Sequence, residues 1–233
     1  MASDTLLSAV PAGSTSPHRG AALTRSLLRC GLIVGPFYLG LGLAQALMRD
    51  GFDLSRHPLS ALANGTGGWV QTLNLALSGI MVIAAAIGFR RVMGARSRGV
   101  VGSLMGFGLG MLVAAAFPMD PADGFPVGTP EGMPTVVSTS GIVHFAAGGL
   151  GFVSLAISCF FMVAAMRRRL QPALARFSLV AGIVIPIAFI AGMVLQAPGI
   201  LGIWLSVITQ FVWIAVMARY FYRASADTSF GPA

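Results

Sequence analysis

Residues 177–218 read FSLVAGIVIPIAFIAGMVLQAPGILGIWLSVITQFVWIAVMA and contain no charged side chain. About 20 apolar residues in a helix cross the hydrocarbon core of a bilayer, where backbone groups must bond within the segment. The stretch is too long for one span, and it is interrupted by Gln196-Ala197-Pro198-Gly199, whose proline and glycine are typical of a turn. We expect two membrane helices here, about 174–195 and 199–219, joined by a tight hairpin.

Further uncharged stretches predict four more membrane helices, at about 27–48, 69–89, 99–118 and 141–166. The composition agrees, because hydrophobic residues make up 56% of the chain, charged residues only 9%, and the mean hydropathy is +0.83. An average soluble domain carries roughly 25% charged residues. The composition therefore excludes a soluble domain, a disordered chain, a nucleic-acid binder and a secreted disulfide scaffold. It predicts an all-α membrane protein, a bundle of six transmembrane helices.

The arginines predict the orientation of these spans. All 15 basic residues are arginines, and all except Arg49 and Arg56 lie in the segments 19–29, 90–98, 167–176 and 219–223. These segments fall on one side of the membrane if the chain crosses it six times. Because cytoplasmic loops are enriched in basic residues, we expect both termini in the cytoplasm. Topology thus explains the net charge of +8, and we expect no nucleic-acid partner.

The two ends of the chain have a different composition from the spans. Residues 1–25 are rich in Ser, Pro, Gly and Ala and lack the apolar core of a signal peptide. We expect 1–25 and 223–233 to be disordered cytoplasmic tails that flank a single domain, 26–222. Arginine in place of lysine, with many alanines and glycines, is typical of a GC-rich bacterial genome. We therefore expect a multi-pass protein of the bacterial plasma (inner) membrane, with membrane lipids as partners.

Small residues recur at helical spacing in two predicted spans. Gly102, Gly106 and Gly110 share one face of 99–118, and Gly31 and Gly35 share a face of 27–48. Helices in lipid associate through close packing at such faces. The faces either pack within the chain or form the seam of a homo-oligomer, and the sequence leaves both open.

Polar side chains form a stripe on the predicted helix 69–89. Gln71, Asn74 and Ser78 lie on one face of it, and Ser206, Thr209 and Gln210 repeat the pattern in 199–219. Polar groups in lipid turn toward the interior of a bundle. The stripes either form hydrogen bonds between helices or line a cavity that opens to the outside.

Nearly all other side chains able to do acid–base or metal chemistry fall on the non-cytoplasmic side. They are Asp50, Asp53, Arg56, His57 and Ser60 in the first exterior loop, Asp120, Asp123 and Glu131 in the second, and His144 one turn into 141–166.

Two features order this exterior face. Pro58 suits the first position of a short helix and Asn64-Gly65 suits its end, so we expect a helix at the outer interface that presents His57 and Ser60. The second loop is rich in proline, which predicts a stiff lid over the outer mouth of the bundle; its prolines are Pro118, Pro121, Pro126, Pro130 and Pro134.

Four blocks resemble the bacterial membrane family known as domain of unknown function 998, over about residues 30–220. They are Asp53-x-x-Arg56-His57-Pro58-x-Ser60, Gly68-Trp69, Phe117-Pro118-x-Asp120-Pro121 and Gly141-x-x-His144. The resemblance implies a multi-helix membrane domain with no established activity. Members often carry His-Gly-x-x-His at the start of the fourth helix, whereas this chain has Ser140 at the first histidine position.

Three classes of function remain open. In the first, the chain is a binding or accessory protein whose exterior pocket holds a lipid head group or small ligand, with Arg56, Gln71 and Asn74 as ligand-binding residues. In the second, it is a hydrolase of a lipid ester or amide. His57, Asp120 and His144 would then hold a divalent metal ion, or act as acid and base with Ser60 as the nucleophile. In the third, it is a transporter without ion coupling, because no Asp, Glu, Arg or Lys lies deep in a span.

A structural alternative assigns the same residues no chemistry. His57 would bond to Asp120, Arg56 would pair with Asp53 or a lipid phosphate, and His144 would bond to the first exterior loop. Together these contacts would form a polar clasp that ties the two exterior loops together.

Overall fold

The computed structural model describes residues 17–195 and 200–225, and this part of the chain is helical and contains no β-strand. The elements are α1 (Pro17–Met48), the 3₁₀ helix η1 (Leu59–Ala63), α2 (Gly68–Met93), the 3₁₀ helix η2 (Gly94–Ser97), α3 (Arg98–Ala116), α4 (Thr139–Arg168), α5 (Pro172–Val194) and α6 (Ile200–Ala224).

Local sequence explains where several helices begin and end. Pro172 is the first residue of α5, where its fixed φ and missing N–H suit a helix start. α4 begins after Ser138, whose hydroxyl accepts a hydrogen bond from the Gly141 N–H at 3.0 Å. α2 ends before Gly94, whose φ of 67° favours glycine.

The α-helices lie where the uncharged stretches predict helices, but two details differ. α1 begins at Pro17, so residues 17–25, expected to be a disordered tail, are helical. Arg91 of α2 explains this, because its guanidinium donates to the Thr24 hydroxyl and the Gly20 carbonyl. The short exterior helix is a single 3₁₀ segment, η1, with Leu59 and Leu62 buried. The predicted hairpin Gln196-Ala197-Pro198-Gly199 lies outside the described residues.

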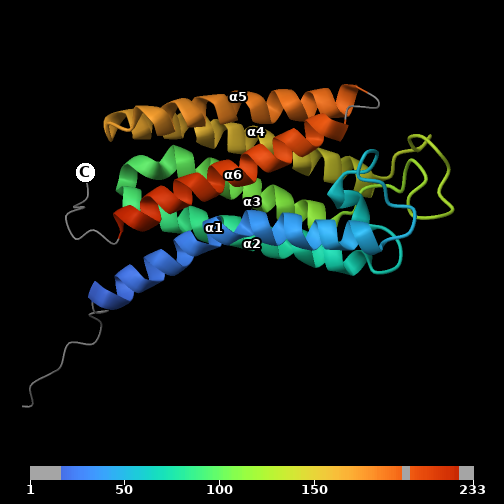
Figure 1. Cartoon of the computed structure of the whole chain (residues 1–233), viewed down its shortest axis with the longest axis horizontal. Helices are drawn as coiled ribbons and strands as arrows, with labels where there is room; N and C mark the ends of the chain where they lie inside the picture. Colours follow the sequence, from blue (N-terminus) through green and yellow to red (C-terminus); the bar gives the residue numbers. More distant parts are fainter. Residues whose placement is uncertain (1–16, 196–199, 226–233) are drawn as a thin grey trace, which may run out of the picture.

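The α-helices form a closed ring, in which each packs against the next along the chain and α6 packs against α1 (Figure 1). The two long connections, residues 49–67 and 117–138, lie together at one end of the bundle. The beginning of α1 and the end of α6 lie at the opposite end. We call the end with the two long connections the loop end. We call the opposite end the arginine end, because the arginine-rich segments 90–98, 167–176 and 219–223 lie at the helix ends there.

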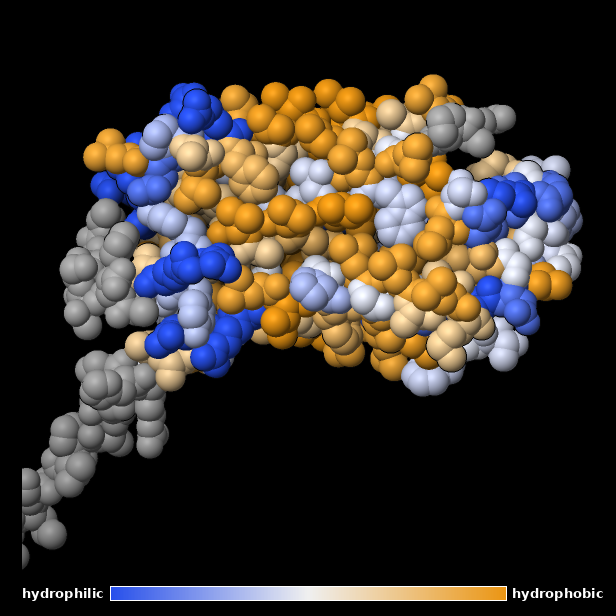
Figure 2. All heavy atoms as spheres, viewed as in Figure 1, coloured by the Kyte–Doolittle hydropathy of each residue, from blue (hydrophilic) through white to orange (hydrophobic). Residues whose placement is uncertain are grey.

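On the face that Figure 2 shows, a hydrophobic band lies between two more polar ends. Large apolar side chains are exposed along this band; examples are Ile80, Leu109, Leu150, Ile187 and Leu201. Within the described residues, five helical stretches are long and apolar enough to cross a membrane, and one of them, Gly68–Ala116, comprises both α2 and α3.

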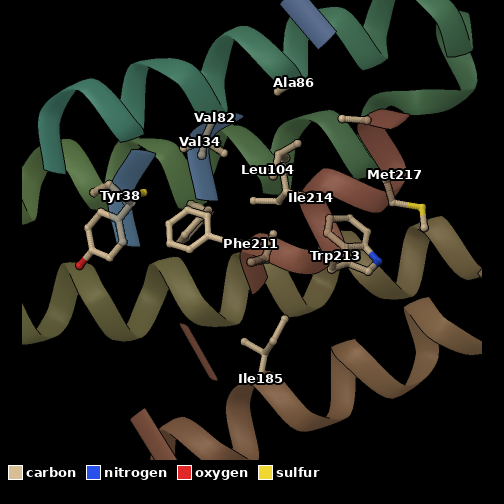
Figure 3. Close-up of a cluster of buried hydrophobic side chains, with 14 of the residues drawn as sticks. Val34, Tyr38, Val82, Ala86, Leu104, Ile185, Phe211, Trp213, Ile214 and Met217 are labelled. Atoms are coloured by element: carbon tan, nitrogen blue, oxygen red, sulfur yellow. The ribbon is translucent and has the colours of Figure 1, made fainter. Parts of the chain in front are cut away.

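Large side chains fill the middle of the ring (Figure 3). Val34 of α1, Leu104 of α3 and Ile214 of α6 are completely buried. Trp213 is also buried, and its indole N–H donates to the Ser178 hydroxyl of α5 at 3.0 Å. The core thus holds together helices that are distant in sequence. In a membrane this depends mainly on close packing, because apolar side chains gain little free energy by moving from lipid into the protein interior.

Glycines set the closest helix contacts. A Cβ at Gly110 would lie 2.8 Å from the Ala147 carbonyl of α4, and one at Gly35 would lie 2.9 Å from Cβ of Phe211. A Cβ at Gly106 or Gly31 would be equally crowded, whereas one at Gly102 would meet open space. Packing within the chain therefore accounts for four of the five small positions in the two predicted faces. A homo-oligomer seam stays a prediction.

Candidate functional site

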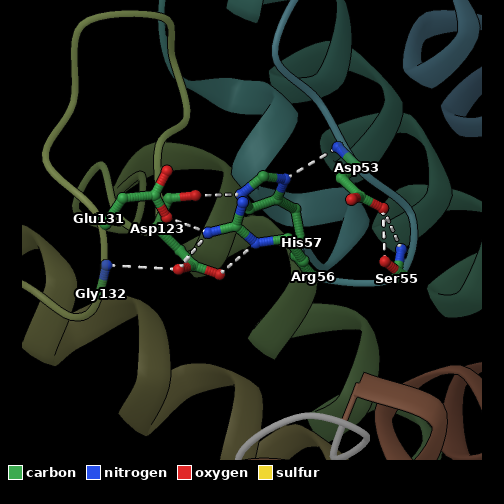
Figure 4. Close-up of polar contacts among 7 residues, drawn as sticks. All are labelled: Asp53, Ser55, Arg56, His57, Asp123, Glu131 and Gly132. Carbon is green, nitrogen blue, oxygen red and sulfur yellow. Dashed lines mark hydrogen bonds and ion pairs between the residues drawn. The ribbon is translucent and has the colours of Figure 1, made fainter.

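An ion-pair network joins the two long connections of the loop end, residues 49–67 and 117–138 (Figure 4). Arg56 donates from Nε and Nη2 to the two carboxylate oxygens of Asp123, at 3.1 and 2.7 Å, and also pairs with Glu131. The Arg56 guanidinium thus pairs with Asp123 and Glu131 and not with the Asp53 carboxylate, whereas its backbone N–H donates to the Asp53 carbonyl at 3.0 Å. The Arg56 guanidinium holds the pKa of Asp123 below its ordinary value.

His57 is a structural residue of the same network. Its Nδ1 accepts from the Asp53 N–H at 2.9 Å, so the proton resides on Nε2, which donates to the Asp123 carbonyl at 2.9 Å. The ring is buried and packs against Phe52 and Phe125, with centroids 5.3 and 5.6 Å away. Both nitrogens are occupied, so His57 has no free lone pair for a metal ion or a substrate proton.

Asp53 shapes the turn that presents Arg56 and His57. Its carboxylate accepts from both the N–H and the hydroxyl of Ser55 at 2.7 Å, which lowers its pKa. Its carbonyl accepts from the His57 N–H at 2.8 Å. The first sequence block therefore encodes one turn with two side chains directed at the other loop.

Asp120 lies at the beginning of α4. Its Oδ2 accepts from the Ser138 N–H at 3.0 Å, at the positive end of the helix dipole. Gly141 makes this approach possible, because a Cβ there would overlap Oδ2. Ser140, the residue at the replaced histidine position, donates to the Pro118 carbonyl at 2.7 Å. Asp120 thus ties the second loop to α4 and has no hydrogen bond to His57.

Arg49 is a residue of this face that sequence reasoning treated only as a topology signal. It donates to the carbonyls of Leu62 and Asn64, which the short helix η1 leaves without partners, and it lies over the Phe125 ring. Its role depends on how the loop folds back over the end of α1, and no local sequence signal pointed to it. Arg49 holds η1 across the mouth of the ring.

His144 differs from His57 in having one nitrogen free. Its Nδ1 lies 3.1 Å from the Ala114 carbonyl and 2.8 Å from the Phe117 carbonyl, so it carries the proton and donates to both. Pro118 has no N–H and leaves the Ala114 carbonyl without its usual helical donor. His144 replaces that donor, and its Nε2 keeps a lone pair with no partner among the described residues.

A cavity of about 130 Å³ lies inside the ring at the loop end, and His144 lines it. Its walls are mainly apolar and come from all six α-helices, with Leu59 and Ser60 of η1 and the preceding Pro58 contributing as well. Gln210 of α6 is a second polar residue of the wall, and its Oε1 is buried without a partner among the described residues. The Ser60 hydroxyl faces Met119 at 3.4 Å. The cavity thus combines a mainly apolar wall with one accessible hydrogen-bond acceptor, Nε2 of His144, while Oε1 of Gln210 is covered by its neighbours.

The polar stripe of α2 lies elsewhere. Gln71 accepts from Gln45 of α1 at 2.9 Å and from Asn74 at 3.0 Å, and Asn74 also donates to the Tyr38 carbonyl. Neither Gln71 nor Asn74 is among the residues that line the cavity. Their contacts are those of hydrogen bonding between helices.

The predicted metal ligands do not converge. Within the described residues, no three His, Cys, Asp or Glu side chains lie close enough to hold a metal ion. His57 and Asp120 are each bonded to backbone groups of different segments, and His144 faces the cavity. The arrangement can accept a hydrogen bond at His144, and it can take up apolar atoms.

The comparisons with known proteins agree with the architecture. Residues 32–220 match the family described as "Protein of unknown function (DUF998)". No curated protein and no solved structure is significantly similar to the chain. The family match covers most of the chain, including every block that forms the loop end, and the chain is therefore a multi-pass helical membrane protein that belongs to the DUF998 family.

Proposed function

We propose that all six α-helices span the plasma membrane, with both termini in the cytoplasm and the loop end outside. The distribution of arginines supports this orientation, since the arginine end carries all but two of them within the described residues. The hydrophobic band between the two polar ends supports it as well (Figure 2).

In this orientation the protein is a lipid-binding or small-ligand-binding membrane protein, and the cavity is its binding site. The observation that carries this proposal is the free Nε2 lone pair of His144 at a mainly apolar cavity. A ligand that matches it has an apolar body and a polar end with a hydrogen-bond donor, such as a hydroxyl or an amine. A hydrogen bond from such a donor to Nε2 contributes about 0.5–1.5 kcal/mol to binding.

The size of the cavity limits what it holds. An apolar cavity of about 150 Å³ in another protein accommodates benzene. The space here therefore fits a small apolar molecule, or the first carbons of a longer chain. Met193 of α5 lines the cavity and is 45% exposed, so the longer chain of a lipid can leave past α5.

The hydrolase is not the function that this geometry favours. A metal-dependent mechanism needs three ligands, and His57 and Asp120 are committed to loop contacts. A metal-free mechanism needs a nucleophile activated by a base, whereas Ser60 donates to Met119. No observation favours a transporter over a binding protein.

A cavity-filling variant tests the proposal. A Cβ at Gly148, which lines the cavity, meets no atom within 4 Å, so Gly148→Leu places its side chain in open space. Gly102→Leu is the matched control, because Gly102 also meets nothing within 4 Å but faces outward on α3. We expect native mass spectrometry of the purified protein to show a bound molecule in the wild type and Gly102→Leu, and to lose it in Gly148→Leu.

A second variant tests the hydrogen bond itself. His144→Asn keeps a donor near the position of Nδ1 for the Ala114 and Phe117 carbonyls but removes Nε2. We expect it to fold and to bind about tenfold more weakly, as the loss of one hydrogen bond predicts. A bound molecule that survives equally in Gly148→Leu and His144→Asn would refute the cavity as its site.

A further inference from the structure

Two arginines converge on one tyrosine at the arginine end. Nη2 of Arg25 and Nη2 of Arg29, both on α1, lie 3.0 Å from the Tyr222 hydroxyl of α6. Their guanidinium carbons lie 4.7 and 5.6 Å from the centre of the Tyr222 ring. Two like charges one helical turn apart therefore share a single neutral partner, an arrangement that disfavours both.

No carboxylate neutralises them within the described residues. The acidic residues that the structure describes all belong to the exterior loops: Asp50, Asp53, Asp120, Asp123 and Glu131. Arg91 is also nearby, since it donates to Thr24, the residue next to Arg25. In addition, Nε of Arg25 is buried and has no hydrogen-bond partner among the described residues. The cluster thus has excess positive charge and an unused donor.

We propose that Arg25, Arg29 and Tyr222 bind a phosphate group, supplied either by an anionic phospholipid or by free phosphate. Both guanidinium groups can donate to phosphate oxygens in the paired geometry that arginine prefers. The Tyr222 hydroxyl accepts from the two arginines, so its own proton is available for a third phosphate oxygen. Basic pockets between membrane helices are recognised sites of this kind for lipid head groups.

This site is independent of the cavity. It lies at the opposite end of the bundle and involves only α1 and α6 (Figure 1). The exposed Ile33, one helical turn from Arg29 on the same face of α1, offers an apolar surface for an acyl chain. A result at either site therefore leaves the other unaffected.

The test titrates three probes into the purified full-length chain in neutral detergent: short-chain phosphatidylglycerol, short-chain phosphatidylcholine and inorganic phosphate. Binding is followed by native mass spectrometry and by the thermal unfolding midpoint. The variant is Arg25→Gln/Arg29→Gln. The matched control is Arg96→Gln/Arg98→Gln, which removes two exposed charges at the same end.

We expect saturable binding of one phosphatidylglycerol to the wild type and to the control. Each basic residue near an anionic head group contributes about fivefold in affinity, so the Arg25/Arg29 variant should bind about thirtyfold more weakly. Without any anion this variant should unfold at a higher temperature than the wild type, because the repulsion is removed. That gain also shows that the variant folds.

The probes separate the two sources of phosphate. Phosphatidylglycerol bound more tightly than inorganic phosphate identifies a lipid site, and equal binding identifies a site for free phosphate. Equal losses in the variant and the control, or equal binding of phosphatidylcholine, would overturn the proposal in favour of diffuse attraction. Asp227 lies outside the described residues, so Asp227→Asn is a further arm. A tenfold gain in phosphatidylglycerol affinity in that variant would mean that the chain supplies its own anion, which would also overturn the proposal.

Discussion

Replacing Gly141 by alanine tests how Asp120 ties the connection 117–138 to α4. A Cβ at Gly141 would overlap Oδ2 of Asp120, so the carboxylate would have to leave the Ser138 N–H. Losing this exposed hydrogen bond to a charged group costs about 1–2 kcal/mol, and losing an anion from a helix N-terminus about 0.3–1 kcal/mol. Alanine in place of glycine restores about 1 kcal/mol of helix propensity. We therefore expect a net destabilisation of about 0.5–2 kcal/mol.

Gly148→Ala is the matched comparison on the same helix. It gains the same helix propensity, but its Cβ meets open space, so we expect a stabilisation of about 0.5–1 kcal/mol. The two variants should therefore differ by about 1–3 kcal/mol, or about 2–12 °C in unfolding midpoint. Thermal unfolding in one detergent at one scan rate measures this difference.

A double-mutant cycle isolates the contact. If Gly141→Ala acts by displacing the carboxylate, it should no longer destabilise a chain that already carries Asp120→Ala. An equal loss in both backgrounds would refute the reasoning, as would Gly141→Ala unfolding at the same temperature as Gly148→Ala.

Three further perturbations have defined outcomes. Arg49→Gln should lower the free energy of unfolding by about 1–3 kcal/mol, and with it the unfolding midpoint, because it removes the donors of the Leu62 and Asn64 carbonyls. Arg98→Gln, at an exposed position, should leave the midpoint unchanged. Arg56 holds the pKa of Asp123 below its ordinary value, so this pair stabilises the fold above about pH 4 and is lost as the pH falls through the lower folded-state value. The midpoint of the wild type should thus fall on acidification more than that of Asp123→Asn, with Asp50→Asn as the control. Gly110→Ala, crowded by the Ala147 carbonyl, should destabilise by about 1–3 kcal/mol, and Gly102→Ala should not.

The positions of the helices could be predicted from the sequence because charge and length constrain a membrane chain strongly. The runs without charged residues marked each helix, although Pro172 and Gly94, which bound α5 and α2 in the structure, were not used to place the boundaries. The beginning of α1 could not be predicted in this way. Its first turns are polar, and they are helical through contacts of Arg91 with Gly20 and Thr24, which depend on how α1 and α2 meet.

The loop end was predicted in outline but not in its pairings. The sequence predicts Arg56, His57, Asp120 and His144 on one face. Arg56 and His57 do lie at the loop end (Figure 4), and Asp120 and His144 contact Ser138 and Phe117, which belong to the connection 117–138 or border α4 there. Sequence reasoning could not identify Asp123 and Glu131 as the partners of Arg56, because that depends on the path of the second loop. The cavity could not be predicted from the sequence either. Several glycines lie near Gly148 in the chain, and only the packing of the helices decides which of them borders empty space.

The two histidines show what the structure adds to the sequence. Each is a single histidine near a proline-containing loop, and each was predicted as a ligand or a base on equal grounds. Hydrogen bonding separates them: His57 accepts at Nδ1 and donates at Nε2, so both nitrogens serve the loops. His144 donates from Nδ1 to the Ala114 and Phe117 carbonyls at the end of α3. The Ala114 carbonyl lacks its usual helical donor because Pro118 has no N–H. Since the proton of His144 is on Nδ1, the lone pair is on Nε2. The block Phe117-Pro118-x-Asp120-Pro121 and the block Gly141-x-x-His144 therefore act as one unit. The proline creates the need for a donor, Gly141 admits Asp120, and the tautomer that results gives the cavity its acceptor.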